Sequence, residues 1–369
     1  MSVILYYFIL SILLLFTFLY FKSTFKQNAF FLYAVFILAL LAGIRDGVGN
    51  DYWNYVEIFN DVPTSIMGLL SYEGHSEFGL LWLCACVKKM GLSYHFIFFL
   101  ISIISGSVFY KVCKNFSSGY LLLYLCLYYA LFYHRFHFNT IRHGLMVSLV
   151  WWAFTFAYKK DLRRFFVCIG VSTCFHLLSL FFIPFYWLLN CSITLKKAIV
   201  FIILAIIIGF YIPIWDIVIN IGGDLLFGEK VSYYVTDYYH NIEDASVGIT
   251  MGLVLNIVFL FLLLISRTIC YDSIYAKSFL TIALFYSVFF SLLFNKYGIF
   301  VERISSVFNV SMIFLYPSII MNLFKKKQDK WISILLMMVY VYLILYKILL
   351  SVNELGELQF IPYKCISPF

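Results

Sequence analysis

Three arginines stand at the expected mouths of apolar segments, where they could bind an anion. Arg45 ends the second apolar run, Arg142 opens a later run, and Arg303 precedes another. A guanidinium group stays charged and can pair with two phosphate oxygens at once, which suits a diphosphate. Charged residues make up only 12% of the chain, so charges at these positions need a reason. We predict that Arg142, Arg303 and Arg45 are diphosphate ligands. The structural alternatives are snorkelling to the membrane interface for Arg142, a helix end with a solvated glycine-rich turn for Arg45, and an ion pair with Glu302 for Arg303.

Four titratable residues are candidates for proton transfer. His176 lies deep within an apolar run, where ionisable residues are functional candidates, and a histidine titrates near neutral pH. Glu77 follows Ser76, an expected N-cap, and could act as a base or simply complement the helix dipole. Asp51 and His143 are the other candidates for the catalytic base.

Two long polar stretches, 45–76 and 216–247, are expected to contact substrate on the same outer side of a membrane. The first is rich in glycine at its start, which lets a backbone approach a ligand closely. Both contain tyrosines, whose rings suit the apolar face of a sugar but are also common at membrane interfaces. The candidate sugar-binding residues are Tyr52, Tyr55, Tyr234 and Tyr238.

The composition places these residues in a membrane protein. Hydrophobic residues make up 64% of the chain, whereas about 45–50% is usual for a soluble domain. The net charge of +8 comes from short basic clusters between apolar runs, a pattern that reports topology and not nucleic-acid binding. The first apolar run is expected to stay as a helix and not to be removed as a signal peptide. We predict an all-α polytopic bundle of about 10–12 transmembrane helices, with residues 1–369 as a single membrane domain.

A membrane-spanning helix needs about 17–25 apolar residues, and ten runs qualify or come close. They are 3–21, 29–44, 92–110, 120–133, 141–158, 198–215, 248–266, 278–294, 304–324 and 331–350. Two further stretches, 78–87 and 165–189, are ambiguous. If all basic clusters are cytoplasmic, the first lies at the outer interface, the second enters and returns, and 134–140 is an outer loop. If both stretches span, Lys111 and the cluster 159–164 lie outside.

Several classes of protein find no support in the sequence. There is no phosphate-binding Walker loop, dinucleotide fingerprint, HExxH or G-x-S-x-G motif. The nine cysteines form neither a metal-binding spacing nor a disulfide framework. No pair of carboxylates has the spacing of a metal site. We therefore predict that the activity needs neither a metal nor another cofactor.

The order of the polar landmarks resembles the EpsG family of bacterial polysaccharide polymerases, which are related to the Wzy-type O-antigen polymerases. The matching pieces are Arg45 with the stretch 48–55, Glu77-Phe78-Gly79, Arg142-His143-Gly144-Leu145, Phe175-His176 and Glu302-Arg303. Asn50 stands where threonine is usual, His143 where glutamine is usual, and Ser179 one residue later than the family's serine. The resemblance covers the chain from the second helix almost to the last.

The resemblance implies an all-helical GT-C-type glycosyltransferase at the outer, periplasmic side of the bacterial cytoplasmic membrane. Its substrates would be undecaprenyl-diphosphate-linked glycans, both as donor and as acceptor. The product would be O-antigen, capsule or exopolysaccharide, and a chain-length regulator and a flippase are candidate partners. Two other classes remain open: a lipid-linked oligosaccharide flippase or other transporter, and a sugar acyltransferase. Transporters often consist of two related halves, which this sequence does not show.

Overall fold

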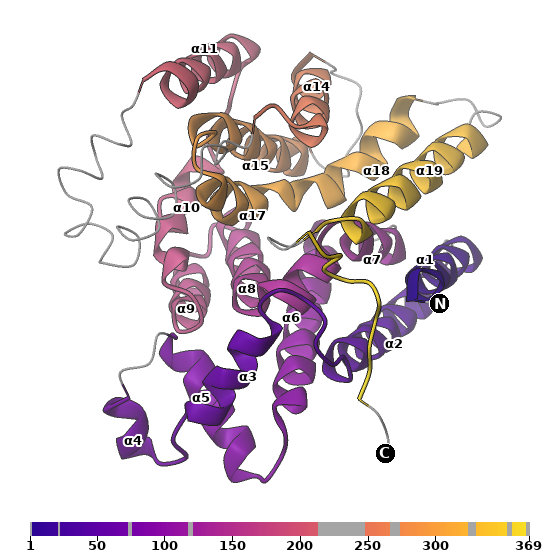
Figure 1. Cartoon of the computed structure of the whole chain (residues 1–369). Helices are drawn as coiled ribbons and strands as arrows, with labels where there is room; N and C mark the ends of the chain where they lie inside the picture. Colours follow the sequence, from indigo (N-terminus) through magenta and orange to yellow (C-terminus); the bar gives the residue numbers. More distant parts are fainter. Residues whose placement is uncertain are drawn as a thin grey trace. The chain divides into compact units, whose positions relative to one another are not determined.

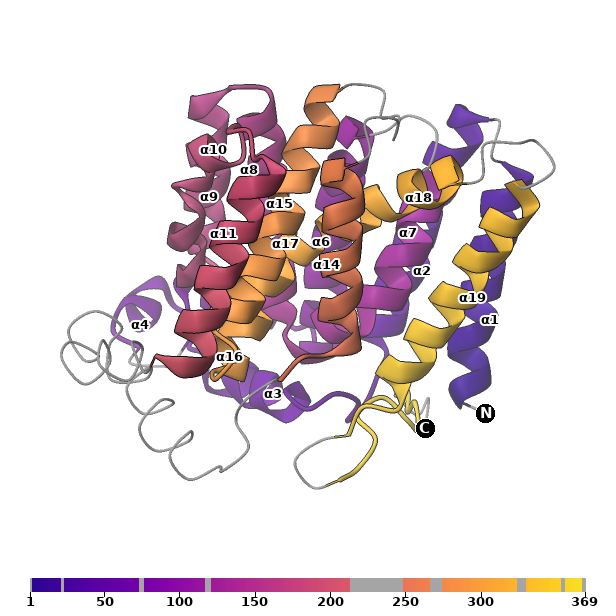
Figure 2. The same cartoon turned by 90° about the horizontal axis from the view of Figure 1, so that it is seen from above.

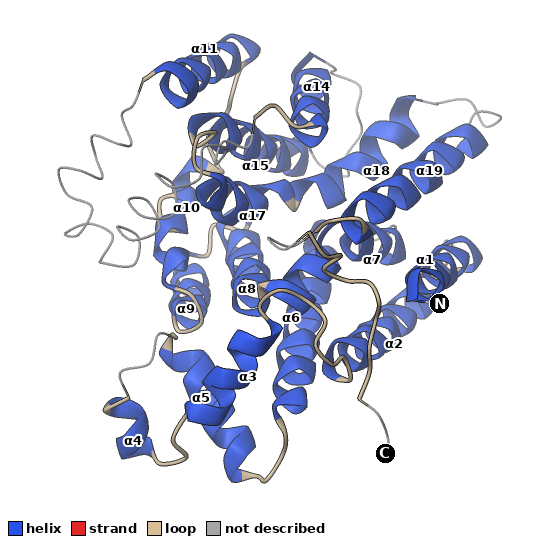
Figure 3. Cartoon of the chain, viewed as in Figure 1, coloured by secondary structure: helices blue, strands red, loops and turns tan. Residues whose placement is uncertain are grey.

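The computed structural model describes most of the chain, and the described part is helical. The described residues are 2–20, 23–72, 76–116, 121–212, 248–265, 274–323, 330–352 and 356–366. Within them the only extended pairings are two isolated β-bridges, Arg45 with Cys365 and Val352 with Leu358 (Figure 3). The predicted all-α class is confirmed. Contacts divide the chain into two compact units, Met1–Asn190 with Leu323–Phe369, and Cys191–Asn322, while the single membrane domain 1–369 stays a prediction.

The first unit contains both ends of the chain, and its first and last helices, α1 and α19, lie side by side (Figures 1 and 2). Its helices are α1 (Ser2–Leu19), α2 (Thr24–Gly43), α3 (Tyr52–Asp61), α4 (Ile66–Leu70), α5 (Phe78–Lys89), α6 (Tyr94–Phe116), α7 (Leu121–Tyr128), the π-helical turns η1 (Tyr129–Tyr133) and η2 (Arg135–Asn139), α8 (Ile141–Tyr158), α9 (Leu162–Thr173), the 3-10 helix η3 (Leu177–Phe182), α10 (Phe185–Leu188) and α19 (Lys330–Leu349). Most of these bounds agree with the predicted apolar runs within a few residues.

The centre of the first unit is α6, which packs against α2 and α8, while α8 also packs against α9. Its 23 residues span about 35 Å at the helical rise, enough to cross a bilayer core of about 30 Å. Buried residues such as Phe98, Ile101 and Phe109 recur along it and face its neighbours. Because α6 holds α2 and α8 together, it places the loops that follow α2 next to the start of α8.

Three of the described helices are long and apolar enough to cross a membrane, namely Lys26–Gly43, Tyr94–Phe116 and Ala276–Leu293. A bent pair, Gly298–Asn309 with Ser311–Pro317, adds a fourth if it counts as one span. Shorter apolar helices cover Val3–Leu19, Leu121–Tyr133, Met251–Ile265 and Leu335–Leu349. The chain is a polytopic membrane protein, whereas the number of 10–12 spans stays a prediction from the sequence.

The two ambiguous stretches form short helices. Helix α5 has 12 residues, about 18 Å of helix, which is too short to cross the bilayer core. Residues 162–189 break into α9, η3 and α10, and the break falls at Cys174 to His176. These lengths suit the predicted interfacial and returning segments, although the sidedness of the loops stays a prediction.

The second unit is organised around α15, which packs against α11, α14 and the segment from η6 to α17. Its elements are α11 (Leu195–Ile206), η4 (Ile207–Tyr211), α14 (Met251–Ile265), α15 (Ile274–Leu293), α16 (Gly298–Phe300), the π-helical turn η6 (Val301–Ser305), α17 (Ser306–Asn309) and α18 (Ser311–Leu323). Ser305 Oγ donates to the Ser287 carbonyl at 2.9 Å and also contacts Ser291 Oγ. These hydroxyls hold the turn that carries Arg303 against α15.

Candidate active site

Three of the predicted site residues form one charged cluster in the first unit. Arg142 Nη1 donates to Glu77 Oε2 at 2.5 Å, and the other oxygen of Glu77, Oε1, lies 4.0 Å from His176 Nδ1. The three residues come from the starts of α8, α5 and η3. Glu77 therefore lies between a cation and an imidazole, an arrangement that can bind an anion and move a proton.

The position of Arg142 explains why it takes a carboxylate partner. It is the second residue of α8, and a cation at a helix N-terminus opposes the helix dipole. Glu77 compensates for this conflict with its negative charge. The two side chains are 27% and 18% exposed, so the pair is not sealed off. Arg142 Nε is buried and has no hydrogen-bond partner among the described residues.

Glu77 reaches the cluster because α5 docks tightly on the end of α9. The sequence predicts Ser76 as the N-cap, but α5 begins at Phe78 and Glu77 itself occupies the N-cap position without a side-chain capping bond. The prediction that Ser76 caps this helix is wrong, because Ser76 lies one residue before the N-cap position. The Gly79 N–H donates to the Cys174 carbonyl at 2.7 Å. A Cβ at Gly79 would lie 2.6 Å from that carbonyl oxygen, so only glycine fits.

His176 is held where the helical segment breaks. It is the N-cap residue of η3, and its Nδ1 accepts a hydrogen bond from the Leu178 N–H at 3.3 Å. The Ser179 hydroxyl donates to the His176 carbonyl at 2.8 Å and lies 2.7 Å from Ser172 Oγ. Ser179 therefore stabilises the backbone around His176. The His176 side chain is 14% exposed.

His143 and Tyr55 border the cluster. The rings of His143 and His176 meet edge to face with centroids 5.8 Å apart, and His143 is buried. The Arg142 guanidinium carbon lies 6.0 Å from the centre of the Tyr55 ring. Burial raises the pKa of Tyr55, and the positive charge of Arg142 acts against that rise. Tyr55 is thus a neutral neighbour of Arg142, and the negative charge of Asp51, another candidate base, also raises the pKa of Tyr55.

Arg45 occupies a different environment, because it is fully buried. Its Nη1 donates to the carbonyls of Val48, at 2.7 Å, and Phe138. The guanidinium carbon lies 4.4 Å from the Phe98 ring centre and 5.4 Å from that of Tyr52. Burial lowers the pKa of Arg45 to about 10, which leaves it charged at neutral pH.

The Phe138 carbonyl explains how this buried charge is balanced. Phe138 belongs to the last turn of the segment Leu121–Asn139, where helix carbonyls lack partners and carry partial negative charge. Arg45 thus complements a helix C-terminus and joins the loop 45–51 to that helix. The predicted role of Arg45 in binding diphosphate remains a prediction, and its contacts show a structural function. Tyr52, a candidate sugar ligand, is also fully buried beside it.

The C-terminal tail contributes to the same loop, and the sequence does not indicate this. The Asp46 N–H donates to the Lys364 carbonyl at 3.0 Å, and the Gly49 N–H donates to the Gln359 carbonyl at 3.1 Å. Gln359 Oε1 accepts a hydrogen bond from Asn139 Nδ2 at 2.7 Å. In Figure 1 the tail continues from α19 as a thin yellow coil. Polar residues after the last helix are the only signal that could have suggested such a contact.

Residues 134–140 differ from the sequence-based expectation of an outer loop. The helix continues through η1 and η2 to Asn139, and His134 and His137 are buried within it. The prediction of a loop here is wrong, because aromatic and polar neighbours bury the two histidines. The predicted start of the next helix at Ile141 is confirmed.

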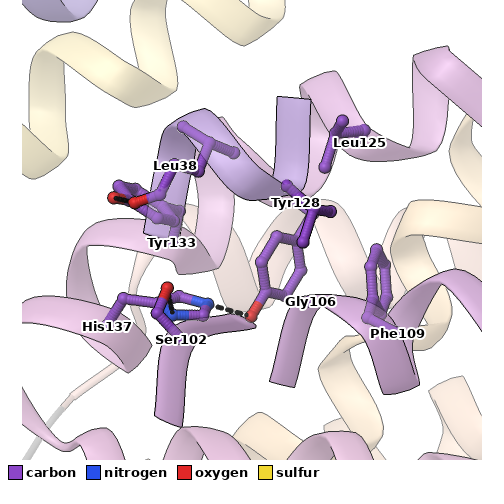
Figure 4. A pocket seen from close by; sticks show the side chains of 9 residues that line it. Leu38, Ser102, Gly106, Phe109, Leu125, Tyr128, Tyr133 and His137 are labelled. Atoms are coloured by element: carbon purple, nitrogen blue, oxygen red, sulfur yellow. Dashed lines mark hydrogen bonds between the residues drawn. The ribbon is translucent and has the colours of Figure 1, made fainter. Parts of the chain in front are cut away.

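His137 has partners on both ring nitrogens. Nδ1 lies 2.8 Å from Ser102 Oγ, and Nε2 lies 2.7 Å from the Tyr128 hydroxyl (Figure 4). Ser102, Tyr128 and His137 border a cavity of about 10 Å³. This volume has room for about one water molecule. A satisfied histidine in so small a cavity has a packing role.

The remaining predicted site residues lie elsewhere. Arg303 belongs to the π-helical turn η6 of the second unit, where it and Glu302 are exposed. Tyr234 and Tyr238, with the rest of the loop 216–247, lie outside the described residues. Among the described residues the structure therefore brings together Arg142, Glu77, His176, His143 and Tyr55.

The apolar helices and the charged cluster place this chain in a class of proteins. Its members are integral membrane proteins with a polar site among apolar helices. The model of the EpsG family matches residues 28–365, nearly the whole chain. The chain belongs to the EpsG family, a family of Wzy-like polysaccharide polymerases. No curated protein and no solved structure matches it. Membership points to a polymerase-type activity on polysaccharides.

Proposed function

We propose that this protein transfers a growing glycan from a polyprenyl diphosphate to a hydroxyl group of a new lipid-linked repeat unit. The reaction takes place at the outer face of the bacterial cytoplasmic membrane. Undecaprenyl-diphosphate-linked glycans are both donor and acceptor, and the enzyme is of the GT-C type and independent of metal. The observation that carries the proposal is the contact of Arg142, Glu77 and His176 in a member of this family.

Arg142 supports the proposal through the charge that develops in the reaction. When the anomeric C–O bond breaks, its electron pair goes to the diphosphate, whose negative charge grows. A fixed cation aimed at that charge lowers the barrier, and the loss of one such group costs about 10²–10³ in rate. Arg142 is partly exposed and already binds a carboxylate, so its side chain can hold an anion.

Arg303 and Arg45 have different places in the proposal. Arg303 is exposed at the start of an apolar segment and is proposed as a further ligand of the diphosphate. Arg45 is enclosed by aromatic rings and by the end of a helix. We assign it the task of holding the loop 45–51, which ends at Asp51 and leads into α3, where Tyr55 lies beside Arg142.

The attacking hydroxyl group must lose its proton to a base, which commonly contributes about 10²–10⁴-fold. Glu77 and His176 are the two groups of the cluster that could accept it, and both are partly exposed. A chain-length regulator and a flippase would act before or after this step as partners.

The proposal is tested in cells in which a chromosomal deletion is complemented by variants. We expect Arg142→Ala and Arg303→Ala to accumulate single lipid-linked repeat units outside the membrane, with polymer reduced by about 10²–10³. Arg164→Ala is the matched control, since this arginine is 72% exposed and pairs with Asp161 at 3.5 Å. Membranes from the wild type should still polymerise in EDTA. Normal long polymer in both variants would refute the proposal, and repeat units trapped inside would indicate a flippase.

A further inference from the structure

The anion partner of Arg142 in this structure is a residue of the protein itself. Arg142 Nη1 donates to Glu77 Oε2, a charge-assisted hydrogen bond between opposite charges. The pair has no net charge, so a diphosphate that approaches Arg142 meets a carboxylate already bound there. Two anions at one guanidinium repel each other. Binding of the diphosphate to Arg142 therefore requires Glu77 to withdraw.

The contacts of Glu77 leave its carboxylate able to turn. Its second oxygen, Oε1, lies 4.0 Å from His176 Nδ1, beyond hydrogen-bond distance. Glu77 stands at an N-cap position without a side-chain capping bond, so the carboxylate can turn without breaking one. Its backbone is held by the Gly79 hydrogen bond to Cys174. The side chain can thus move while the start of α5 stays in place.

The hydrogen bonding of His176 indicates which group receives the proton. Nδ1 accepts from the Leu178 N–H at 3.3 Å, so its lone pair is occupied. A neutral imidazole in this position carries its proton on Nε2 and donates there. His176 is then suited to donate a hydrogen bond. Between His176 and Glu77, the carboxylate released from Arg142 is then the group that accepts a proton.

We propose that Glu77 competes with the substrate diphosphate for Arg142, so that donor binding releases Glu77 to act as the proton acceptor. The inference rests on the proposed function. In the reaction, the acceptor hydroxyl oxygen bonds to the anomeric carbon and its proton passes to Glu77. The anomeric C–O bond breaks and its electron pair leaves with the diphosphate. The base is therefore set free only when a donor occupies the site.

The test separates binding from turnover. The protein in lipid nanodiscs is titrated with undecaprenyl diphosphate that carries no sugar, and polymerisation is measured on lipid-linked repeat units. We expect Glu77→Gln to bind the probe at least about fivefold more tightly, within the usual range of coupling between sites. We expect its turnover to fall by about 10²-fold or more. Glu57→Gln is the control, because Glu57 is exposed on α3, and it should change neither quantity.

A second variant keeps the test decisive if Glu77→Gln is poorly folded. Glu77→Asp retains the charge but shortens the reach to Arg142, so it should bind the probe more tightly than the wild type and turn over more slowly. Probe binding that is unchanged or weaker in both folded variants would overturn the inference. Arg142→Ala distinguishes the two proposals. If it binds the probe like the wild type, the proposed function fails; if it binds weakly while Glu77→Gln gains nothing, only the inference fails.

Discussion

Replacement of Gly79 by alanine tests whether the docking of α5 on Cys174 positions the charged cluster. The added Cβ would lie 2.6 Å from the Cys174 carbonyl oxygen and 2.9 Å from its carbon, whereas ordinary contact begins at 3.4 Å. Both atoms belong to the backbone, so they cannot turn aside like the end of a side chain. The start of α5 must therefore move by about 0.8 Å, the difference between 2.6 and 3.4 Å.

The consequences of this shift can be estimated. The hydrogen bond from the Gly79 N–H to Cys174, now 2.7 Å, would approach its limiting length, and overpacking costs about 1–3 kcal/mol. Glu77, two residues earlier, would move with α5 relative to Arg142 and His176. A misplacement of about 1 Å at a reacting group can cost about 10²-fold in rate. We expect Gly79→Ala to reduce polymer per molecule of protein by about that factor.

Gly170 provides a matched control in the same unit. It lies within α9, and an added Cβ there meets no atom within 4 Å. Alanine at a helical glycine of this kind stabilises by about 0.5–1 kcal/mol. Polymer length is read on gels of lipid-linked glycan and normalised to the protein in the membrane by immunoblot. If Gly79→Ala polymerises as well as Gly170→Ala, the reasoning is refuted.

Two further predictions concern the loop 45–51. Arg45→Met leaves the carbonyls of Val48 and Phe138 without this donor, and each unpaired carbonyl should lower the stability of the fold by about 1–3 kcal/mol. A thiol-reactive dye should therefore detect the buried cysteines at a lower temperature. An unchanged midpoint of thermal unfolding would contradict the structural role. Gln359→Ala removes the hydrogen bond from Asn139 at 2.7 Å, so trypsin should cleave after Lys364 faster than in the wild type, and equal rates would show that this contact does not secure the tail.

The identity of the site residues could be read from the sequence because charge is rare in it. Arg142, Glu77 and His176 stand out against apolar surroundings, and the structure brings these three together. Their separation along the chain hid which of them pair. The sequence suggested three equivalent arginines, but Arg45 is enclosed by Phe98 and the end of a helix. Equivalent positions at the ends of apolar runs can thus lead to burial or to partial exposure.

Other features depend on distances that no local pattern encodes. Gly79 matters because the Cys174 carbonyl, far away in the sequence, approaches it too closely for a side chain. The tail reaches Asp46 and Gly49 through backbone hydrogen bonds, which any residue type could make. The sequence did not predict the helix through His134 and His137, because a cluster of polar residues indicates a loop when the residues that bury it are unknown.

The sequence by itself determined that this is a helical membrane protein of the EpsG family with scarce charges at the ends of apolar segments. Hydropathy and motif order are local properties, and lipid imposes hydrogen-bonded helices on long apolar runs. Only the tertiary structure decided that Glu77 forms an ion pair with Arg142 beside His176. It also decided that Arg45 lies between aromatic rings. The reason is that pairing and burial depend on how α5, α8 and η3 pack, and packing is a property of surfaces distant in the chain.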